Sequence, residues 1–408
     1  MKYIIILGDG MADEPIGSLN NKTAIQAANT PYMDMLARMG RNGLLDTIPK
    51  GFSPGSEIAN LSVLGYDVPA VYEGRGVLEA ASIGVDVLPG EMAMRCNLVS
   101  IDGELIKNRS AGHISTTEAN ELIQFLEEKL GDEQFSFHSG VSYRHVLKMK
   151  NGNKNISCTP PHDIPEKPFR PHLIKADGEN SKDIAEPKIT AEALNNLIIK
   201  SQEILANHPV NIKRVSEGKD PANSIWPWSP GFRPKMKHLS EMFPIKSGAV
   251  ISAVDLIRGI GVYAGLEVIM VEGATGLYDT NYEGKAEAAL NALKDNDFVY
   301  LHIEASDEAG HEGDVDLKVK TIEYLDNRVL KTIYEEVKNW NEPVTIAILP
   351  DHPTPCAIRT HTRDPIPFII WHRDIEPDSV QTYDEFAARN GSYGLLHSNQ
   401  FMKSLFNE

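Results

Sequence analysis

Cysteine is scarce in this chain. Only Cys96, Cys158 and Cys356 occur in 408 residues, and no two of them have the Cys-x-x-Cys spacing of a zinc or redox site. An odd, scattered count also provides no disulfide framework. We therefore expect free thiols and a protein of the reducing cytoplasm.

Long apolar runs are also missing. The apolar stretch 3–7 is too short for a signal peptide and ends in Gly8-Asp9-Gly10. The longest later apolar region, 248–271, is interrupted by the charged residues Asp255, Arg258 and Glu267. A bilayer span needs about twenty mainly apolar residues, so we expect neither a secretory leader nor a membrane helix.

Positive charge is in deficit. The chain has 40 Lys and Arg against 57 Asp and Glu, for a formal net charge of -17. Nucleic acids and anionic membranes require concentrated basic surface, so we expect neither as a partner. A small anionic substrate remains compatible, because a few arginines and bound cations can make one cleft locally positive. No GxxxxGK[ST] phosphate loop is present.

The two ends of the chain alternate between short apolar runs and helical patterns. Such alternation predicts an α/β fold with a mainly parallel sheet and helices on both faces. In the first part we predict strands at 3–7 and 44–48 and helices at 23–39, with a new start at Pro31, and at 57–64. In the last part we predict strands at 298–303, 344–349 and 368–371, a loop at 304–313 and a long helix at 315–339.

The middle of the chain has a different composition. The stretches 154–172 and 209–244 are rich in proline, which predicts segments that punctuate a sheet rather than build one. Trp226 and Trp228 flank one of these prolines, and we expect them to anchor a hydrophobic hinge. A chain of this length exceeds one typical core. The simplest architecture is a discontinuous core, 1–85 plus 240–408, with an α+β cap at 86–239 inserted into it.

Seven polar side chains follow predicted strands or stand in loops punctuated by glycine and proline, where α/β proteins place their active sites. Three carboxylates, three imidazoles and one hydroxyl suit two divalent cations such as Mn²⁺, Zn²⁺ or Mg²⁺. The hydroxyl would act as a nucleophile in phosphoryl transfer. These residues are Asp9, Ser56, Asp307, His311, Asp351, His352 and His361.

Each motif also has an ordinary structural interpretation. Asp9 suits an Asp-Gly turn, and Ser56 before Glu57 is typical of a helix N-cap. Asp307 and His311 have the i, i+4 spacing of one helical face, but they lie in an acidic stretch that could be a solvated loop. The joint occurrence of these motifs, in this order, is what favours a metal site.

The predicted cap offers candidates for binding an anion. Arginine suits phosphate and carboxylate because its planar fork binds them bidentately. Any one of these residues could equally be an ordinary surface residue. The candidates are Arg95, Arg109, His113 and Arg144.

Taken together, the chain resembles the alkaline phosphatase superfamily and, within it, the archaeal-type cofactor-independent phosphoglycerate mutases. The resemblance covers nearly the whole chain. The motifs that carry it are Gly8-Asp9-Gly10-Met11, Pro54-Gly55-Ser56-Glu57, the runs 60–66, 248–256 and 273–276, Asp307-Glu308-Ala309-Gly310-His311-Glu312-Gly313, and Asp351-His352.

The resemblance implies an alkaline-phosphatase-like core that holds two divalent metal ions, Mn²⁺ first, with no need for 2,3-bisphosphoglycerate. Ser56 would take the phosphoryl group of 3-phosphoglycerate, and the glycerate would reorient beneath a closed cap and be rephosphorylated at its 2-hydroxyl. The implied ligands of one metal are Asp307, His311 and His361, and those of the other are Asp9, Ser56, Asp351 and His352.

One departure from the family pattern concerns the substrate. The family has a more arginine-rich run where this chain has residues 108–113, and His113 stands in place of an arginine. A homoserine kinase-type phosphotransferase and a metal-dependent phosphohydrolase therefore remain alternatives to the mutase. A binding protein that has lost catalysis is a fourth reading, disfavoured because the nucleophile and all the other ligands are present.

Overall fold

The computed structural model describes residues 1–177 and 185–407, which form two compact units. Unit 1 comprises residues 1–72 and 235–408, and unit 2 comprises residues 73–234. These divisions differ from the boundaries at 85 and 240 expected from the sequence. The first division comes earlier because α5 (Arg75–Ser82) packs on the sheet of unit 2.

Unit 1 is built on an eight-stranded sheet in the order β11-β10-β12-β1-β13-β14-β2-β15. Neighbouring strands from β11 to β13 are parallel, whereas β14 runs antiparallel to β13 and β2. The mainly parallel sheet expected from the sequence is therefore confirmed. Its strands are β1 (Lys2–Gly8), β2 (Arg41–Asp46), β10 (Gly248–Ile251), β11 (Glu267–Val268), β12 (Phe298–Ile303), β13 (Val344–Leu349), β14 (Ile366–Trp371) and β15 (Leu395–His397).

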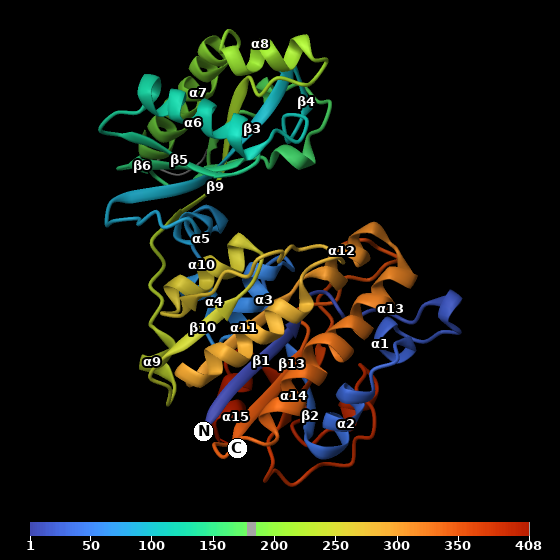
Figure 1. The fold of residues 1–408 in the computed structure, drawn as a ribbon. Helices are drawn as coiled ribbons and strands as arrows, with labels where there is room; N and C mark the ends of the chain where they lie inside the picture. The colour runs from blue at the N-terminus through green and yellow to red at the C-terminus, as the bar shows by residue number, and fades with distance from the viewer. Residues whose placement is uncertain (178–184, 408) are drawn as a thin grey trace. The chain divides into compact units, whose positions relative to one another are not determined.

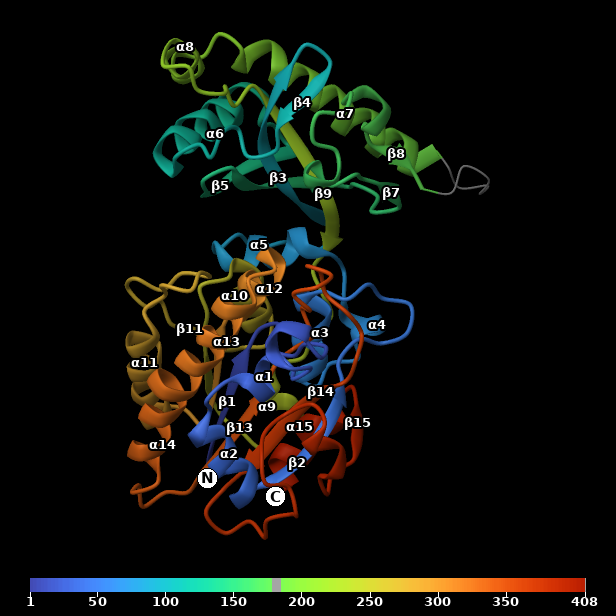
Figure 2. The same ribbon diagram turned by 90° about the vertical axis from the view of Figure 1, so that its right-hand side faces the viewer.

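Helices cover both faces of this sheet. Helices α11 and α14 lie on one side, and α3, α10 and α15 lie on the other (Figures 1 and 2). The central strands are buried on both faces, which explains why their sequences are continuously apolar. The helices are α1 (Ala24–Ala27), α2 (Pro31–Met39), α3 (Ser56–Val63), α4 (Val68–Val71), α9 (Leu239–Met242), α10 (Asp255–Tyr263), α11 (Tyr282–Asp295), α12 (Ala305–Glu312), α13 (Val315–Tyr324), α14 (Lys331–Val337) and α15 (Gln400–Asn407).

Two sequence predictions for unit 1 need correction. The segment 304–313, predicted as a loop, contains helix α12, which ends at Gly313 with a left-handed φ of 72° that glycine adopts without strain. The predicted long helix 315–339 is interrupted by π-helical turns at Leu325–Leu330. There the buried Asp326 accepts backbone hydrogen bonds from Tyr32 and Met33 at the start of α2.

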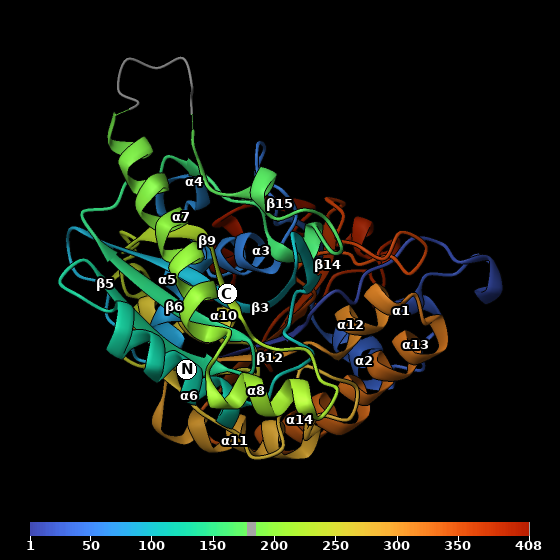
Figure 3. The same cartoon turned by 90° about the horizontal axis from the view of Figure 1, so that it is seen from above.

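Unit 2 is an α+β domain with a five-stranded antiparallel sheet. Helices α6 and α7 pack against β5 and β9 respectively, on the side of the sheet facing the viewer in Figure 3. The strands are β3 (Glu91–Asp102), β4 (Leu105–Asn108), β5 (Phe135–Val141), β6 (Arg144–Lys150) and β9 (Ser224–Phe232), with a separate pair β7 (Ile156–Ser157) and β8 (Lys175–Ala176). The helices are α5, α6 (Thr116–Leu130), α7 (Ala185–Leu205) and α8 (Pro209–Ser216).

The expectation that residues 209–244 would not build a sheet is wrong for β9. This strand contains Pro227 and Pro230 and pairs with β3 from Ser224 to Phe232. It has β3 as its only strand partner among the described residues, so it is an edge strand, where the missing proline N–H can face away from the ladder. Trp226 and Trp228 are buried core residues of unit 2 rather than a hinge.

The cysteines and the lengths of the helices bear on two expectations about the whole chain. All three cysteines are free, with Cys96 and Cys356 buried. Among the helices described here, none is both long and apolar enough to cross a bilayer.

Candidate active site

The predicted metal ligands of unit 1 gather at one edge of its sheet. Strands β1, β12 and β13 are parallel, with Gly8 beside Ile303 and Leu7 beside Leu349. Their carboxyl ends therefore lie together, and the chain leaves them at Asp9, at the start of α12 and at Asp351. This is where open α/β sheets place their ligands.

The antiparallel strand β14 brings two further segments to the same edge. Its first residue, Ile366, pairs with Leu45 near the end of β2. Because the two strands run in opposite directions, the segment before β14 and the segment after β2 leave the sheet at the same end. The first carries His361 and the second leads to Ser56.

One cluster of ligand atoms consists of Asp307, His311 and His361. The Nε2 atoms of the two histidines are 2.9 Å apart, and the Asp307 oxygens lie 3.2 Å from His311 and 3.4 Å from His361. Two nitrogens bound tetrahedrally to one cation at about 2.1 Å would be about 3.4 Å apart. The spacing therefore suits one shared cation.

The other ring nitrogens of these histidines face backbone carbonyls. Nδ1 of His311 lies 3.0 Å from the carbonyl oxygen of Arg359, and Nδ1 of His361 lies 3.4 Å from that of Pro54. A carbonyl only accepts, so each Nδ1 must carry the proton and donate. In the neutral ring each Nε2 then has the lone pair that a metal ion binds, the arrangement found in metal-binding histidines.

A second cluster surrounds Nε2 of the buried His352. This atom lies 3.2 Å from the hydroxyl of Ser56, 3.4 Å from Asp351 and 3.7 Å from Asp9. Asp9, Asp307 and His352 also form a group whose ligand atoms lie within 4.8 Å of one another. Asp307 thus belongs to both clusters.

The electrostatics of Asp9 support the presence of a cation. Burial raises the pKa of its carboxyl group well above the usual value, and the nearby charges of Asp351 and Asp307 raise it further. One oxygen accepts from His302 at 3.0 Å, while the other, Oδ1, is buried with no hydrogen-bond partner. An unneutralised carboxylate cluster with an orphaned oxygen is what a divalent cation would stabilise.

The pKa of Asp307 is shifted in the opposite direction from that of Asp9. Burial alone would raise its pKa, but hydrogen bonds with His311 and His361 hold the pKa well below the usual value. In turn the hydrogen bond to Asp307 raises the pKa of His311 to about 9. The hydroxyl of Thr354 also donates to Asp307 at 2.5 Å. Asp307 is therefore held as an anion in a fixed orientation.

Ser56 is the first residue of α3, whose N-cap is Gly55 rather than the serine itself. The helix therefore begins beside the second cluster, and its first free N–H groups provide a site for an anion such as a phosphoryl group. Ser56 as a whole residue is half-buried. A serine hydroxyl between a helix N-terminus and two candidate cation sites suits phosphoryl transfer.

Sequence reasoning missed the residues that hold these ligands. Asn60, one turn after Ser56, donates to the carbonyl oxygen of Ser56 at 2.8 Å and to Asp351 at 2.9 Å, and accepts from Tyr300 at 2.5 Å. His302 lies between Asp9 and Ser252. The only available signal was the presence of polar side chains within apolar elements.

In unit 2, Arg95 lies on the central strand β3 and is nearly buried. Its guanidinium bonds to Glu79 at 3.0 Å and to Asn97 at 3.1 Å, and lies 5.0 Å over the ring of Trp228. Burial lowers the pKa of Arg95, and the neighbouring charges of Arg75 and Arg144 lower it further. Arg75, Arg95 and Arg144 are thus close enough for their charges to interact and form the basic cluster of unit 2, in which Glu79 pairs with Arg75 and Arg95.

The other candidates for anion binding differ in their surroundings. Arg144 begins β6, opposite Asn97, and its Nε is buried without a hydrogen-bond partner. Arg109 is exposed. Burial is the main cause of the lowered pKa of His162, and the positive charge of Arg109 lowers that pKa further. His113 is exposed in a left-handed conformation with φ of 51°, and nothing places it in the cluster. Arg75 was missed by sequence reasoning.

Known proteins resemble this chain over its full length. A family described as 2,3-bisphosphoglycerate-independent phosphoglycerate mutase matches residues 37–211. The relative of that name from Methanosarcina acetivorans is 49% identical over 407 residues, covering 99% of both chains. A protein from Geobacter sulfurreducens, named as a probable mutase of this kind, is 49% identical and covers 98% of both chains.

Solved structures share the fold. The PH0037 protein from Pyrococcus horikoshii has a TM-score of 0.83 and 30% identity, covering 100% of this chain and 96% of its own. The cofactor-independent phosphoglycerate mutase from Thermoplasma acidophilum has a TM-score of 0.69 and 28% identity, covering 100% of this chain and 99% of its own.

Proposed function

Since the chain belongs to the family of 2,3-bisphosphoglycerate-independent phosphoglycerate mutases, we propose that Ser56 carries the phosphoryl group during the reaction. The protein is an isomerase that interconverts 3-phosphoglycerate and 2-phosphoglycerate. The first transfer forms the bond between phosphorus and Oγ of Ser56 and breaks the bond to O3 of glycerate. The second breaks the bond to Ser56 and forms one to O2 of the same glycerate.

The observation that carries this proposal is the position of the Ser56 hydroxyl. Ser56 is the first residue of α3, and its hydroxyl lies 3.2 Å from Nε2 of His352. The residues around it fit divalent metal ions, because the buried Oδ1 of Asp9 lacks a partner and the neutral rings of His311 and His361 would offer the lone pairs of their Nε2 atoms. One ion would be held by Asp307, His311 and His361, and the other by Asp9, Ser56, Asp351 and His352.

Mn²⁺ is the metal we propose for this mixture of carboxylate and imidazole ligands, with Zn²⁺ and Mg²⁺ as the alternatives. Bound cations would lower the pKa of the serine hydroxyl and neutralise the phosphoryl oxygens. The chain itself contributes orientation. The N–H groups at the start of α3 would bind the oxygens of a phosphoryl group on Ser56, and Asn60 fixes the main chain of Ser56.

We propose that the basic cluster of unit 2 binds the negatively charged substrate. Arg95 is held by Glu79 and Trp228, and Arg144 has an Nε without a partner. A planar guanidinium binds carboxylate or phosphate bidentately. Arg109 and His113 are the exposed members of the set, and their substitution should affect substrate binding less than that of Arg95 or Arg144.

The setting of the reaction is part of the proposal. We expect the protein to work in the cytoplasm on a small phosphorylated substrate, without a nucleic-acid or membrane partner, as the net charge of -17 favours. Cell fractionation of the native host would test the location. Activity without added 2,3-bisphosphoglycerate would test the independence from that compound.

The experiment for Ser56 is a trapping measurement. Protein loaded with Mn²⁺ is mixed with 3-phosphoglycerate, quenched in acid and digested, and phosphoserine is located by mass spectrometry. We expect phosphate on Ser56 and none in Ser56→Ala, whose mutase activity should fall at least about a thousandfold. The control is Ser53→Ala, at an exposed serine of the loop before α3. This variant should keep the phosphate on Ser56 and the mutase activity.

Two results would contradict this assignment. If Ser56→Ala retains the mutase activity of the unaltered protein with normal metal content, Ser56 is not the carrier. Phosphate on another residue under the same quench would reassign the nucleophile. Phosphohomoserine formed from ATP and homoserine, with no change in 3-phosphoglycerate, would instead favour the homoserine kinase-type alternative.

A further inference from the structure

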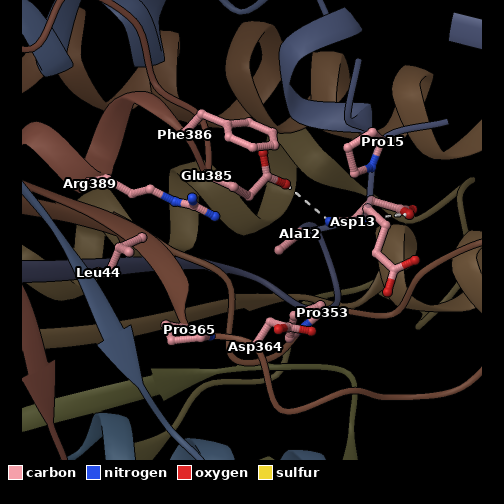
Figure 4. Close-up of a pocket in the computed structure, with 11 residues that line it drawn as sticks. Ala12, Asp13, Pro15, Leu44, Pro353, Asp364, Pro365, Glu385, Phe386 and Arg389 are labelled. Atoms are coloured by element: carbon pink, nitrogen blue, oxygen red, sulfur yellow. Dashed lines mark hydrogen bonds between the residues drawn. The ribbon is translucent and has the colours of Figure 1, made fainter. Parts of the chain in front are cut away.

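A pocket lies in unit 1, away from the candidate metal ligands, with a volume of about 390 Å³ (Figure 4). Sites for small molecules generally fall between about 300 and 1,000 Å³ and combine apolar walls with a few polar groups. This pocket follows that pattern. Its apolar lining includes Pro15, Leu44, Pro353, Pro365 and Phe386.

Three segments of the pocket wall continue directly from candidate metal ligands. Pro353 follows His352, Ala12 lies three residues after Asp9, and Asp364 lies three residues after His361. A molecule bound in the pocket would therefore touch the same short segments that hold the ligands of both clusters. None of the metal ligands lines the pocket itself.

Arg389 is the only basic side chain in the pocket lining. Its guanidinium lies 5.0 Å over the ring of Phe386 and extends toward the centre of the pocket in Figure 4. It forms no ion pair with any residue in the described part of the chain. Stacking covers one face of a guanidinium and leaves its edge free to donate two hydrogen bonds to a carboxylate.

The acidic residues of the lining fall into two groups. Asp13 is neutralised by the fully buried Lys318 at 2.8 Å. Glu385 accepts from the backbone N–H of Asp13 at 3.0 Å and from the hydroxyl of Thr23 at 2.7 Å, and burial raises its pKa to about 7. Two carboxylates of the lining form no ion pair among the described residues.

These two are the exposed Glu14 and Asp364. Their charges outnumber that of Arg389, so a simple anion would be repelled. A ligand with an ammonium group and a carboxylate would offer a partner of opposite charge to the two acidic residues and to Arg389.

We propose that this pocket binds a small zwitterion, an α-amino acid with an apolar side chain. Its carboxylate would pair with Arg389, its ammonium group with Glu14 and Asp364, and its side chain would pack on Leu44 and Pro365. Binding of this kind is independent of the mutase reaction, so its test does not rely on catalysis.

A buried network connects the pocket wall to the metal site. Lys318 pairs with Asp13 and also donates to the carbonyl oxygen of Thr354 at 2.8 Å. The hydroxyl of Thr354 donates to Asp307 at 2.5 Å. Occupation of the pocket would therefore change the affinity for the metal ion, and the metal would change the affinity for the amino acid by the same factor.

The binding test uses isothermal titration calorimetry of the full chain with L-leucine and L-phenylalanine. Two matched compounds lack one charge each: 4-methylpentanoate has no ammonium group, and 3-methylbutylamine has no carboxylate. We expect at least one amino acid to bind, and both matched compounds to bind at least about tenfold more weakly. No binding of either amino acid, or equal binding of one matched compound, would overturn the proposal.

The site is assigned with Arg389→Gln, which removes the carboxylate partner from an exposed position and should not disturb folding. The matched control is Arg38→Gln, an exposed arginine of the same unit that does not line the pocket. Amino-acid binding should weaken at least about tenfold in Arg389→Gln and persist in Arg38→Gln. Equal binding in both variants would place the ligand elsewhere and overturn the assignment.

The coupling is measured by titrating Mn²⁺ with and without saturating amino acid. We expect the dissociation constant for Mn²⁺ to change at least about fivefold, and the change to disappear in Arg389→Gln. An unchanged dissociation constant in the unaltered protein would overturn the coupling through Lys318 and Thr354. Mutase activity enters neither measurement, so failure here leaves the proposed reaction untouched.

Discussion

Asn60 donates a hydrogen bond of 2.9 Å to Asp351 from one turn beyond the proposed nucleophile. The same amide group donates to the carbonyl oxygen of Ser56 at 2.8 Å. On its other side Asn60 accepts from the buried hydroxyl of Tyr300 at 2.5 Å. One side chain thus fixes a candidate metal ligand and the main chain of the nucleophile relative to each other.

Replacing Asn60 should therefore impair metal binding and catalysis together. In Asn60→Ala we expect both Mn²⁺ affinity and kcat to fall about 10- to 100-fold, the usual effect of losing a group that orients a metal ligand. Tyr300→Phe removes only the bond that holds Asn60, so its effect should be smaller. Metal titration and steady-state kinetics measure both. Unchanged affinity in Asn60→Ala with intact folding would contradict this role.

Arg95 offers a test of substrate binding in unit 2. Arg95→Lys keeps the positive charge but loses the planar fork that bonds Glu79 and Asn97 and stacks on Trp228. We expect the KM for 3-phosphoglycerate to rise about tenfold, equivalent to about 1.4 kcal/mol, with metal content unchanged. Arg170→Lys, at an exposed ion pair of the same unit, is the control. A similar KM in the two variants would remove Arg95 from the binding site.

Metal binding should become stronger as pH rises. In the metal-free protein Asp307 raises the pKa of His311 to about 9, so this imidazole carries a proton at neutral pH. A metal ion needs the neutral ring and must displace that proton, which gives up to about a tenfold gain in affinity per pH unit below pH 9. Mn²⁺ titrations at pH 6, 7 and 8 measure the slope. His311→Gln should flatten it, and an equal slope in that variant would exclude His311 as its source.

Unit 2 should lose stability in acid because of His145. This residue is buried, its Nδ1 accepts from the backbone N–H of Gly140 at 3.0 Å, and burial lowers its pKa to about 3. The unfolded chain protonates near pH 6.5, whereas the folded chain does not. Stability is therefore complete above about pH 6.5 and falls by about 1.4 kcal/mol per pH unit between there and pH 3.

Hydrogen exchange of the β6 amides at several pH values measures this local stability. His145→Gln cannot titrate, so its protection should depend less on pH than that of the unaltered protein. The other buried acids titrate in both proteins and cancel in the comparison. Identical pH slopes would show that His145 does not cause the acid lability.

The sequence was sufficient to predict candidate ligands that follow strands, but not the residues that position them. Asp9 and Asp351 could be predicted because they lie one and two residues after continuous apolar strands. His302 and Thr354 could not, because their importance depends on contacts with Asp9 and Asp307, far away in the sequence. The only indication in the sequence was a histidine, His302, within the apolar strand β12.

Predictions from local composition were wrong for two segments whose structure depends on tertiary contacts. The acidic run at 304–313 reads as a solvated loop, but Asp307 and His311 stabilise one face of α12 by pairing with each other. Prolines 227 and 230 read as breaks, but the strand that contains them lies at an edge of the sheet. Neither outcome follows from the composition of the segment alone.

The central claim is that the phosphoryl group leaves and returns to the same glycerate. The most direct test is phosphorus and carbon NMR of the Mn²⁺-loaded protein with 3-phosphoglycerate and excess ¹³C-labelled glycerate, without 2,3-bisphosphoglycerate. We predict 2-phosphoglycerate with no ¹³C label and no inorganic phosphate. Inorganic phosphate as the only product, or labelled 2-phosphoglycerate, would contradict the account.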